Sequence, residues 1–199
     1  METFGQAYPA TFEVDRVERI ANWRPLVQWL LAIPHFLILN GLQAVSQAVA
    51  VISWFAIVFT GKLPEGLANL QCLYIRYNNR ATAYAGFLRE EYPPFAFDVV
   101  APDPDNYPPV LTGFAPELED RNRLTVGFRI ILVIPQVIVL VLLGIAALVA
   151  WVIALFAVLF TGRWPEGLRT FVVGVMRWAT RVEAYLALLT DAYPPFSLE

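Results

Sequence analysis

Hydrophobic residues concentrate in two long stretches of the chain, at positions 25–59 and 124–160. The segment from Ile130 to Phe160 contains no charged residue. A helix of about 20 apolar residues is long enough to cross the hydrocarbon core of a bilayer. The pattern therefore predicts a helical membrane protein with at least one transmembrane segment.

The two stretches belong to a tandem repeat whose copies are offset by 101 positions, as from Pro34 to Pro135. Two motifs recur at this spacing: Phe-Thr-Gly-basic-x-Pro-Glu-Gly-Leu at 59–67 and 160–168, and Tyr-Pro-Pro-Phe at 92–95 and 193–196. Each copy in such a chain is a structural unit of its own. We expect a first repeat at 1–100 and a second at 101–199.

Both apolar stretches are too long for one membrane-crossing helix, so each must be interrupted. Prolines stand at the equivalent positions 34 and 135, and a proline inside a helix removes a hydrogen bond and kinks or ends the helix. We predict spanning helices from about 34 to 59 and from about 135 to 160. In the motif that follows, glycine ends a helix, and proline and glutamate suit the first turn of the next one.

The helical segments after this turn, 67–91 and 168–192, decide how often the chain crosses the membrane. The second is apolar on nearly all sides, whereas the first is more polar and by itself suggests a helix lying in the interface. If neither segment crossed, two copies of the same turn sequence would lie on opposite sides of the membrane. We therefore predict an all-α membrane fold with about four transmembrane helices in two parallel hairpins. Two spans plus interfacial helices remain the alternative.

Short extended segments are expected outside the membrane. Residues 8–15 alternate apolar and polar side chains, as half-buried strands do, and 107–113 is a weaker counterpart. Residues 95–100 follow two prolines, which favour an extended chain. These segments predict a small antiparallel ribbon between the opening and closing parts of a repeat. Basic residues cluster on the side that would hold both termini, which predicts that the termini and the connector at 98–120 are cytoplasmic.

Composition supports the membrane setting and excludes other classes. Hydrophobic residues make up 58% of the chain and charged residues only 16%, with a mean hydropathy of +0.55. The net charge of −3, with both signs scattered, argues against a nucleic-acid partner. The single cysteine, Cys72, excludes an internal disulfide and a cysteine-based metal site. No cofactor or metal ion is expected.

Polar residues inside the predicted membrane helices are the candidates for function. Arginines recur at equivalent positions of the two copies: Arg76 and Arg80, Arg177 and Arg181. An arginine at membrane depth costs at least about 2.5 kcal/mol, so such residues usually pair inward or mark a functional site. They predict contact with lipid or with a partner protein, unless they only anchor their helices.

The two copies differ in what faces these arginines. Asn40, Gln43 and Gln47 share one face of the first spanning helix, and counting from the turn places Gln43 and Gln47 level with the first arginine pair. The second copy has Val141, Gly144 and Leu148 instead. Its arginines need another partner, which could be a lipid phosphate, backbone carbonyls, a partner subunit or Glu183.

Catalytic constellations are not recognisable in the sequence. The only histidine, His35, lies beside the first helix-breaking proline and is replaced by Gln136 in the second copy, as expected of a structural residue. Glu65 and Glu166 suit the first turn of a helix. No nucleophile elbow, phosphate-binding loop, dinucleotide fingerprint or zinc-binding helix motif occurs.

The motif set resembles the DUF4389 family of bacterial membrane proteins, and the resemblance covers nearly the whole chain as two copies. The residues that carry it are the opening Tyr-Pro-x-x-Phe-x-Val-Asp, Ile33-Pro34-His35, the turn motif, Arg-(Tyr/Trp)-x-x-Arg and the closing Tyr-Pro-Pro-Phe. The second copy lacks the opening Phe-x-Val-Asp and has glutamine in place of the histidine. The resemblance implies the architecture and the bacterial membrane setting but no activity.

Two functional hypotheses follow from the sequence. The first is a non-enzymatic integral membrane accessory or scaffold subunit, which spans the bacterial cytoplasmic membrane several times and contacts lipids and partner membrane proteins. The second is a lipid-binding or small-solute transport protein that uses the intramembrane arginines. An enzyme is a distant third, because no set of catalytic groups can be named.

Overall fold

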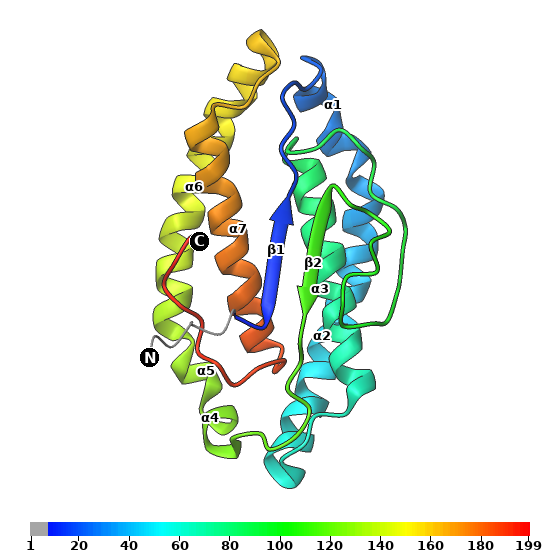
Figure 1. Ribbon diagram of the computed structural model, residues 1–199, viewed down its shortest axis with the longest axis vertical. Helices are drawn as coiled ribbons and strands as arrows, with labels where there is room; N and C mark the ends of the chain where they lie inside the picture. Colours follow the sequence, from blue (N-terminus) through cyan, green and yellow to red (C-terminus); the bar gives the residue numbers. More distant parts are fainter. Residues whose placement is uncertain (1–7) are drawn as a thin grey trace, which may run out of the picture.

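The computed structural model describes residues 8–199 and is mainly helical (Figure 1). The first copy contributes β1 (Ala10–Val14), α1 (Arg24–Leu31), α2 (Ile33–Thr60) and α3 (Glu65–Ala85). The second copy contributes β2 (Val110–Phe114), α4 (Arg123–Gly127), α5 (Arg129–Leu132), α6 (Ile134–Thr161) and α7 (Glu166–Leu186). The long helices thus follow the same order in both copies.

The helix boundaries lie where the sequence motifs predict them. Pro34 stands in the first turn of α2, where a proline needs no hydrogen-bond partner, and so it begins a helix instead of kinking one. Gly61 and Gly162 end α2 and α6 in the left-handed conformation, with φ of 75° and 68°, which glycine adopts without strain. The predicted sequence of helix, turn and helix is therefore confirmed in both copies.

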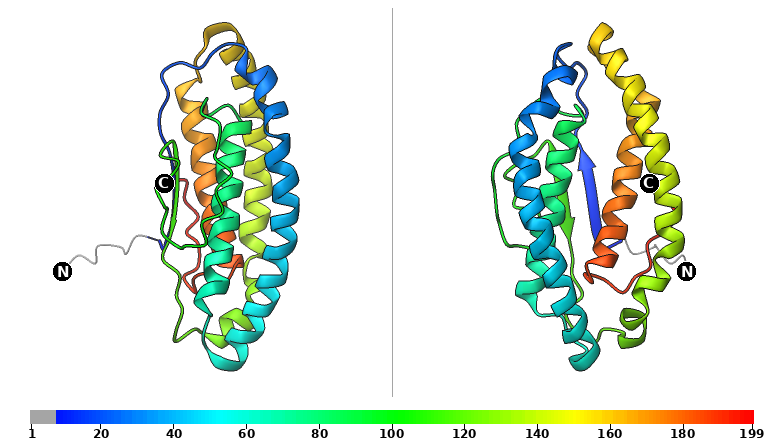
Figure 2. Two further views of the ribbon diagram at one scale, coloured as in Figure 1. Left: turned by 90° about the vertical axis from the view of Figure 1, so that its right-hand side faces the viewer. Right: turned by 180° about the vertical axis from the view of Figure 1, so that it is seen from behind.

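The elements form three layers, which are clearest from the side (Figure 2, left). The two-stranded ribbon and the connectors form one outer layer, α3 and α7 form the middle layer, and α2 and α6 form the other outer layer. Each strand packs on a middle helix, β1 on α7 and β2 on α3. Polar backbone thus covers one face of the middle layer and two apolar helices cover the other.

A pseudo-twofold axis relates the two copies. The amide of Ile20 donates to the carbonyl of Gly162 over 2.8 Å, and the amide of the equivalent Arg121 donates to the carbonyl of the equivalent Gly61 over 3.0 Å. Each copy therefore lays its opening segment against the turn of the other copy. The two helical hairpins run antiparallel, and the expected parallel arrangement is wrong.

The axis passes through all three layers, at right angles to the helices. Phe12 and Thr112 form the central pair of the antiparallel β1–β2 ribbon. Below them, Asn79 of α3 donates to the hydroxyl of its equivalent, Thr180 of α7, over 3.0 Å. The ribbon therefore joins the opening segments of the two copies, whereas we expected an opening and a closing segment to pair.

Within residues 8–199, two helices, α2 and α6, are long and apolar enough to cross a membrane. Only 17% of the residues in the most apolar part of either helix are buried, whereas the core helix of a soluble protein is mostly buried. α3 and α7 are not among them, because their 21-residue sequences are more polar and include the arginine pairs. Four transmembrane helices are therefore not supported.

Candidate functional site

The arginines of α3 hold the polar layer in place. Arg76 is 3% exposed, and its guanidinium donates to the carbonyl of Thr112 in β2 and to three consecutive carbonyls at 100–102, the latter at 2.9 Å each. Arg80 donates to Asn106 over 2.7 Å and to the carboxylate of Asp103 over 3.0 Å. Both side chains therefore bind the connector to the helix and point away from the apolar outer layer.

The arginines of α7 do the same in the second copy. Arg177 donates to the carbonyl of Phe12 in β1 over 3.2 Å and to that of Leu198 over 3.1 Å. Arg181 donates to the carbonyls of Ser197 and Glu199. The sequence left four kinds of partner open for these two arginines, and in the structure both donate to backbone carbonyls.

The polar residues of α2 do not meet the arginines. Asn40, Gln43 and Gln47 lie on the exposed side of α2, and Asn40 donates to the carbonyl of Phe36 in its own helix over 2.8 Å. The expected pairing of these side chains with Arg76 and Arg80 is wrong. Counting residues from the turn could not tell which face of each helix points at the other, and the contacts of Ser46 with Gln71 and of His35 with Tyr77 show that it also misjudged which residues of the two helices lie level.

The outer faces of α2 and α6 form a broad apolar surface. On α6 the exposed large side chains are all apolar, and the most exposed of them are Leu142, Leu148 and Phe160 at 62%, 63% and 82%. On α2 the corresponding face mixes apolar side chains such as Leu37 and Phe59 with the three amides. A continuous apolar surface of this size is rare on soluble monomers and marks a membrane or protein interaction site.

Glu183 of α7 lines a cavity of about 180 Å³ between α2, α3 and α7. On the opposite wall, Gln71 donates to the carbonyl of Ser46 over 2.8 Å, and the Ser46 hydroxyl donates back to the Gln71 side-chain oxygen. The Oε2 atom of Glu183 is closed off from solvent and has no hydrogen-bond partner among the described residues. Burial raises the pKa of this carboxyl to about 7.

A second, larger cavity of about 330 Å³ adjoins the first. Ala50 and Leu186 line both cavities, and the walls of the larger one are mainly apolar. Exposed residues of the apolar surface, Val51 and Ile130, stand at its rim. The two cavities therefore join a polar recess to the outer apolar surface.

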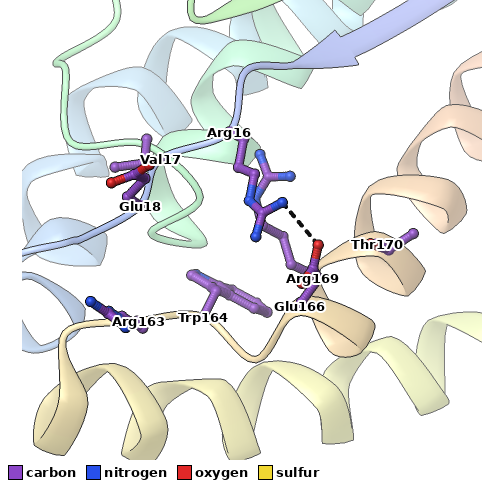
Figure 3. A pocket seen from close by; sticks show the side chains of 8 residues that line it. All are labelled: Arg16, Val17, Glu18, Arg163, Trp164, Glu166, Arg169 and Thr170. Carbon is purple, nitrogen blue, oxygen red and sulfur yellow. Dashed lines mark ion pairs between the residues drawn. The ribbon is translucent and has the colours of Figure 1, made fainter.

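A third pocket, of about 390 Å³, lies where the opening segment of the first copy meets the turn of the second (Figure 3). Arg16 and Glu166 form an ion pair across it at 2.9 Å, and both side chains are exposed to solvent. Arg169 donates to the carbonyls of Val14 and Asp15. Burial and the nearby charge of Arg16 lower the pKa of Arg169. These contacts join the two copies, and an exposed ion pair of this kind adds at most about 1 kcal/mol.

Asp191 in the closing segment carries an ion network that the sequence motifs did not suggest. Its carboxylate accepts from Arg121 over 2.7 Å and from Arg129 over 2.6 Å, and the backbone amide of Asn122 donates to it as well. Burial alone would raise the pKa of Asp191, but these hydrogen bonds and the two guanidinium charges hold it below its usual range. The network fastens the end of the chain to α4 and α5.

His35 has a structural environment. Its Nδ1 lies 2.7 Å from the hydroxyl of Tyr77, and its ring stacks on Phe95 of the closing motif at 4.4 Å between centroids. In the second copy, Gln136 accepts from Trp178 at the equivalent place. Each of these residues holds a closing motif against its own hairpin. Among the described residues, no group of three His, Cys, Asp or Glu side chains is arranged to hold a metal ion.

Sequence reasoning missed the cavity because its lining comes from three helices and from both copies. One comparison within the sequence could have pointed to it: Ala50 in the first copy stands where the second copy has Trp151.

A family described as "Domain of unknown function (DUF4389)" matches residues 22–96 and again 123–197. No curated protein and no solved structure is detectably similar to the chain.

Proposed function

Because the chain belongs to the DUF4389 family and carries two copies of its domain, we propose that it is a non-enzymatic accessory or scaffold subunit of a membrane assembly. The outer faces of α2 and α6 seat it in the bilayer. The supporting observation is the exposed face of α6, whose large side chains are all apolar and which belongs to the uncharged run from Ile130 to Phe160. Contact of this surface with lipid chains carries no free-energy penalty, whereas its exposure to water is unfavourable.

We infer that the helices lie along the membrane surface. The ribbon and the connector run beside the middle of α3, held there by Arg76 and Arg80, and α3 in turn packs along α2. If α2 crossed the bilayer, Asp98, Asp103 and an open sheet edge would lie at membrane depth. Backbone groups without partners cost several kcal/mol each in hydrocarbon.

The pseudo-twofold axis supports the same orientation. With helices across the membrane, the two copies of the turn motif would lie on opposite sides, since the hairpins are antiparallel. With the axis along the membrane normal, both turns lie at the same depth and meet the same environment. One turn sequence then serves both copies without conflict, and the polar layer faces water on one side of the membrane. We place this layer on the cytoplasmic side of a bacterial inner membrane, because the family resemblance implies a bacterial membrane and the clustering of basic residues predicts cytoplasmic termini.

Cysteine labelling at equivalent positions tests the orientation. In a Cys72→Ala background, Lys62→Cys and Arg163→Cys place probes at the two exposed turns, and Asp105→Cys places one on the connector. In sealed vesicles of known sidedness, a membrane-impermeant maleimide should label all three from one side. Labelling of the two turns from opposite sides would show that the helices cross and would refute the in-plane orientation.

The scaffold role needs partners, which mild extraction tests. A protein that acts as a subunit should migrate with other membrane proteins on native gels after gentle detergent treatment and should crosslink to them in the membrane. A solitary species near 22.4 kDa, with no crosslinked partner, would contradict the role.

Lipid binding or transport at the four arginines receives no support from the geometry. Their guanidinium groups donate to backbone carbonyls, to the amide oxygen of Asn106 and to the carboxylate of Asp103, on the side away from the apolar surface. If these arginines nevertheless bind lipid, replacing Arg177 and Arg181 with leucine should remove co-purified lipid without unfolding the protein. We expect loss of stability instead.

A further inference from the structure

Within residues 8–199, the space equivalent to the polar cavity beside Glu183 is filled in the other half of the pseudo-symmetric molecule. At the equivalent place in the other half, the indole of Trp151 stands where Ala50 would be and donates to the carbonyl of Gly86 over 3.0 Å. A Cβ atom on Gly86 would lie 2.7 Å from that indole, so the fit there is close. The sequence thus fills one of two equivalent spaces and leaves the other open.

The open space is also the one with polar walls. Glu183 corresponds to Thr82 in the other copy, and Gln71 corresponds to Val172. Gln47 lies at the rim, and its counterpart is Leu148. The half of the molecule with the open space therefore has the small residue and the polar side chains. The half with the filled space has the large residue and mainly apolar side chains.

The carboxyl of Glu183 contains a hydrogen-bond acceptor that has no partner among the described residues. Ser46 and Gln71 are bonded to each other, and the Oε2 atom of Glu183 is left without a donor. A buried acceptor without a partner is unfavourable, and a bound donor would remove that penalty. The missing group is thus a hydrogen-bond donor, either a hydroxyl or an ammonium.

The rest of the ligand should be apolar. The adjoining cavity of about 330 Å³ is lined mainly by hydrocarbon and shares Ala50 and Leu186 with the polar recess. Its rim belongs to the surface that we assign to the bilayer. An amphiphile can enter from the membrane with its chain in the larger cavity and its donor group beside Glu183.

We propose that this is a binding site for a lipid or other long-chain amphiphile whose polar end is a hydroxyl or an ammonium group. Entry from the membrane rests on the proposed function. The site itself does not, because binding in detergent solution needs no particular orientation in a bilayer. The two proposals can therefore fail separately.

Three probes of equal chain length test the chemistry. Radiolabelled decanol, decylamine and decanoate are equilibrated with the protein in detergent micelles at about pH 8.5, where Glu183 is ionised, with empty micelles as background. Decanol and decylamine should bind the wild-type protein saturably and at least tenfold more tightly than decanoate, whose carboxylate offers no donor and repels Glu183. Equal binding of all three, or no saturable binding, would overturn the proposal.

Variants copied from the other half of the molecule test the location. Ala50→Trp introduces the residue that fills the equivalent space and should abolish saturable binding, whereas Ile52→Trp, on the exposed face of the same helix and outside both cavities, should leave it unchanged. Glu183→Thr should reduce the preference for decanol and decylamine over decanoate at least tenfold. Full binding by a folded Ala50→Trp variant would refute the site.

Native mass spectrometry of the extracted protein separates the two sources of such a ligand. A lipid-sized adduct that disappears in Ala50→Trp identifies a membrane lipid as the occupant. Binding of the probes without any such adduct identifies a free lipophilic molecule.

Discussion

Glu183 should make the protein less stable as the pH rises through neutrality. The unperturbed carboxyl has a pKa of 4.5, and burial raises the pKa of Glu183 to about 7. The folded state therefore holds a proton that the unfolded state has already released between these values. By linkage, the contribution of Glu183 to stability is greatest below about pH 4.5 and falls as the pH rises to about 7.

The size of the effect follows from the shift. Each unit of pKa corresponds to about 1.4 kcal/mol, so the full shift corresponds to about 3 kcal/mol. Because the side chain lines a cavity that water can enter, part of this penalty is relieved, and we expect a loss of about 1 to 3 kcal/mol. Glu183→Gln keeps the shape of the side chain and removes its titration. It should thus be more stable than the wild type by this amount at pH 8 and about equal to it near pH 4.5.

Denaturant unfolding in detergent, followed by tryptophan fluorescence at several pH values between 4.5 and 8, measures this difference. Glu13→Gln, at an exposed position of β1, is the control and should follow the wild type at every pH. Parallel stability curves for Glu183→Gln and the wild type would refute the reasoning, because they would mean that the carboxyl ionises in the folded protein at no cost.

Three further variants test contacts between separate parts of the fold by the same unfolding assay. Gly86→Ala should cost about 1 to 3 kcal/mol through its clash with Trp151, and the cost should shrink when Trp151 is replaced by leucine; an equal cost in both backgrounds would contradict the clash. Arg76→Leu should cost about 3 kcal/mol, because it leaves buried carbonyls without donors, and should make residues 98–109 sensitive to protease; unchanged proteolysis would show that another contact holds the connector. Asp191→Asn should cost about 3 to 5 kcal/mol, because two buried guanidinium groups lose their counter-charge, and a cost below about 1 kcal/mol would mean that water replaces the carboxylate.

Local features of the fold could be predicted from the sequence because they depend on neighbouring residues. Gly61 and Pro64 mark the end of one helix and the start of the next in the order that backbone geometry requires. The repeat established that both hairpins share one construction, and the alternation at 8–15 predicted β1. The apolar surface of α6 was visible as an uncharged run.

The relative placement of these parts could not be predicted in the same way. Whether the two hairpins run parallel or antiparallel depends on contacts between residues about 100 positions apart, such as Ile20 with Gly162. The same holds for the partners of the arginines. Residue spacing sets the depth of Arg76 along its helix, but only the packed layers determine that it faces the ribbon and not α2.

By itself, the sequence determined the repeat, the helix ends, the apolar surface and the absence of a recognisable catalytic motif. The tertiary structure alone decided that the copies are antiparallel, that the arginines bind backbone carbonyls and that Glu183 of the second copy faces a cavity lined by the first. The physical reason is that helix ends and apolar faces follow from interactions between residues close in the chain. A cavity between three helices depends on how separate surfaces pack, and one difference in side-chain volume, between Ala50 and Trp151, determines which side stays open.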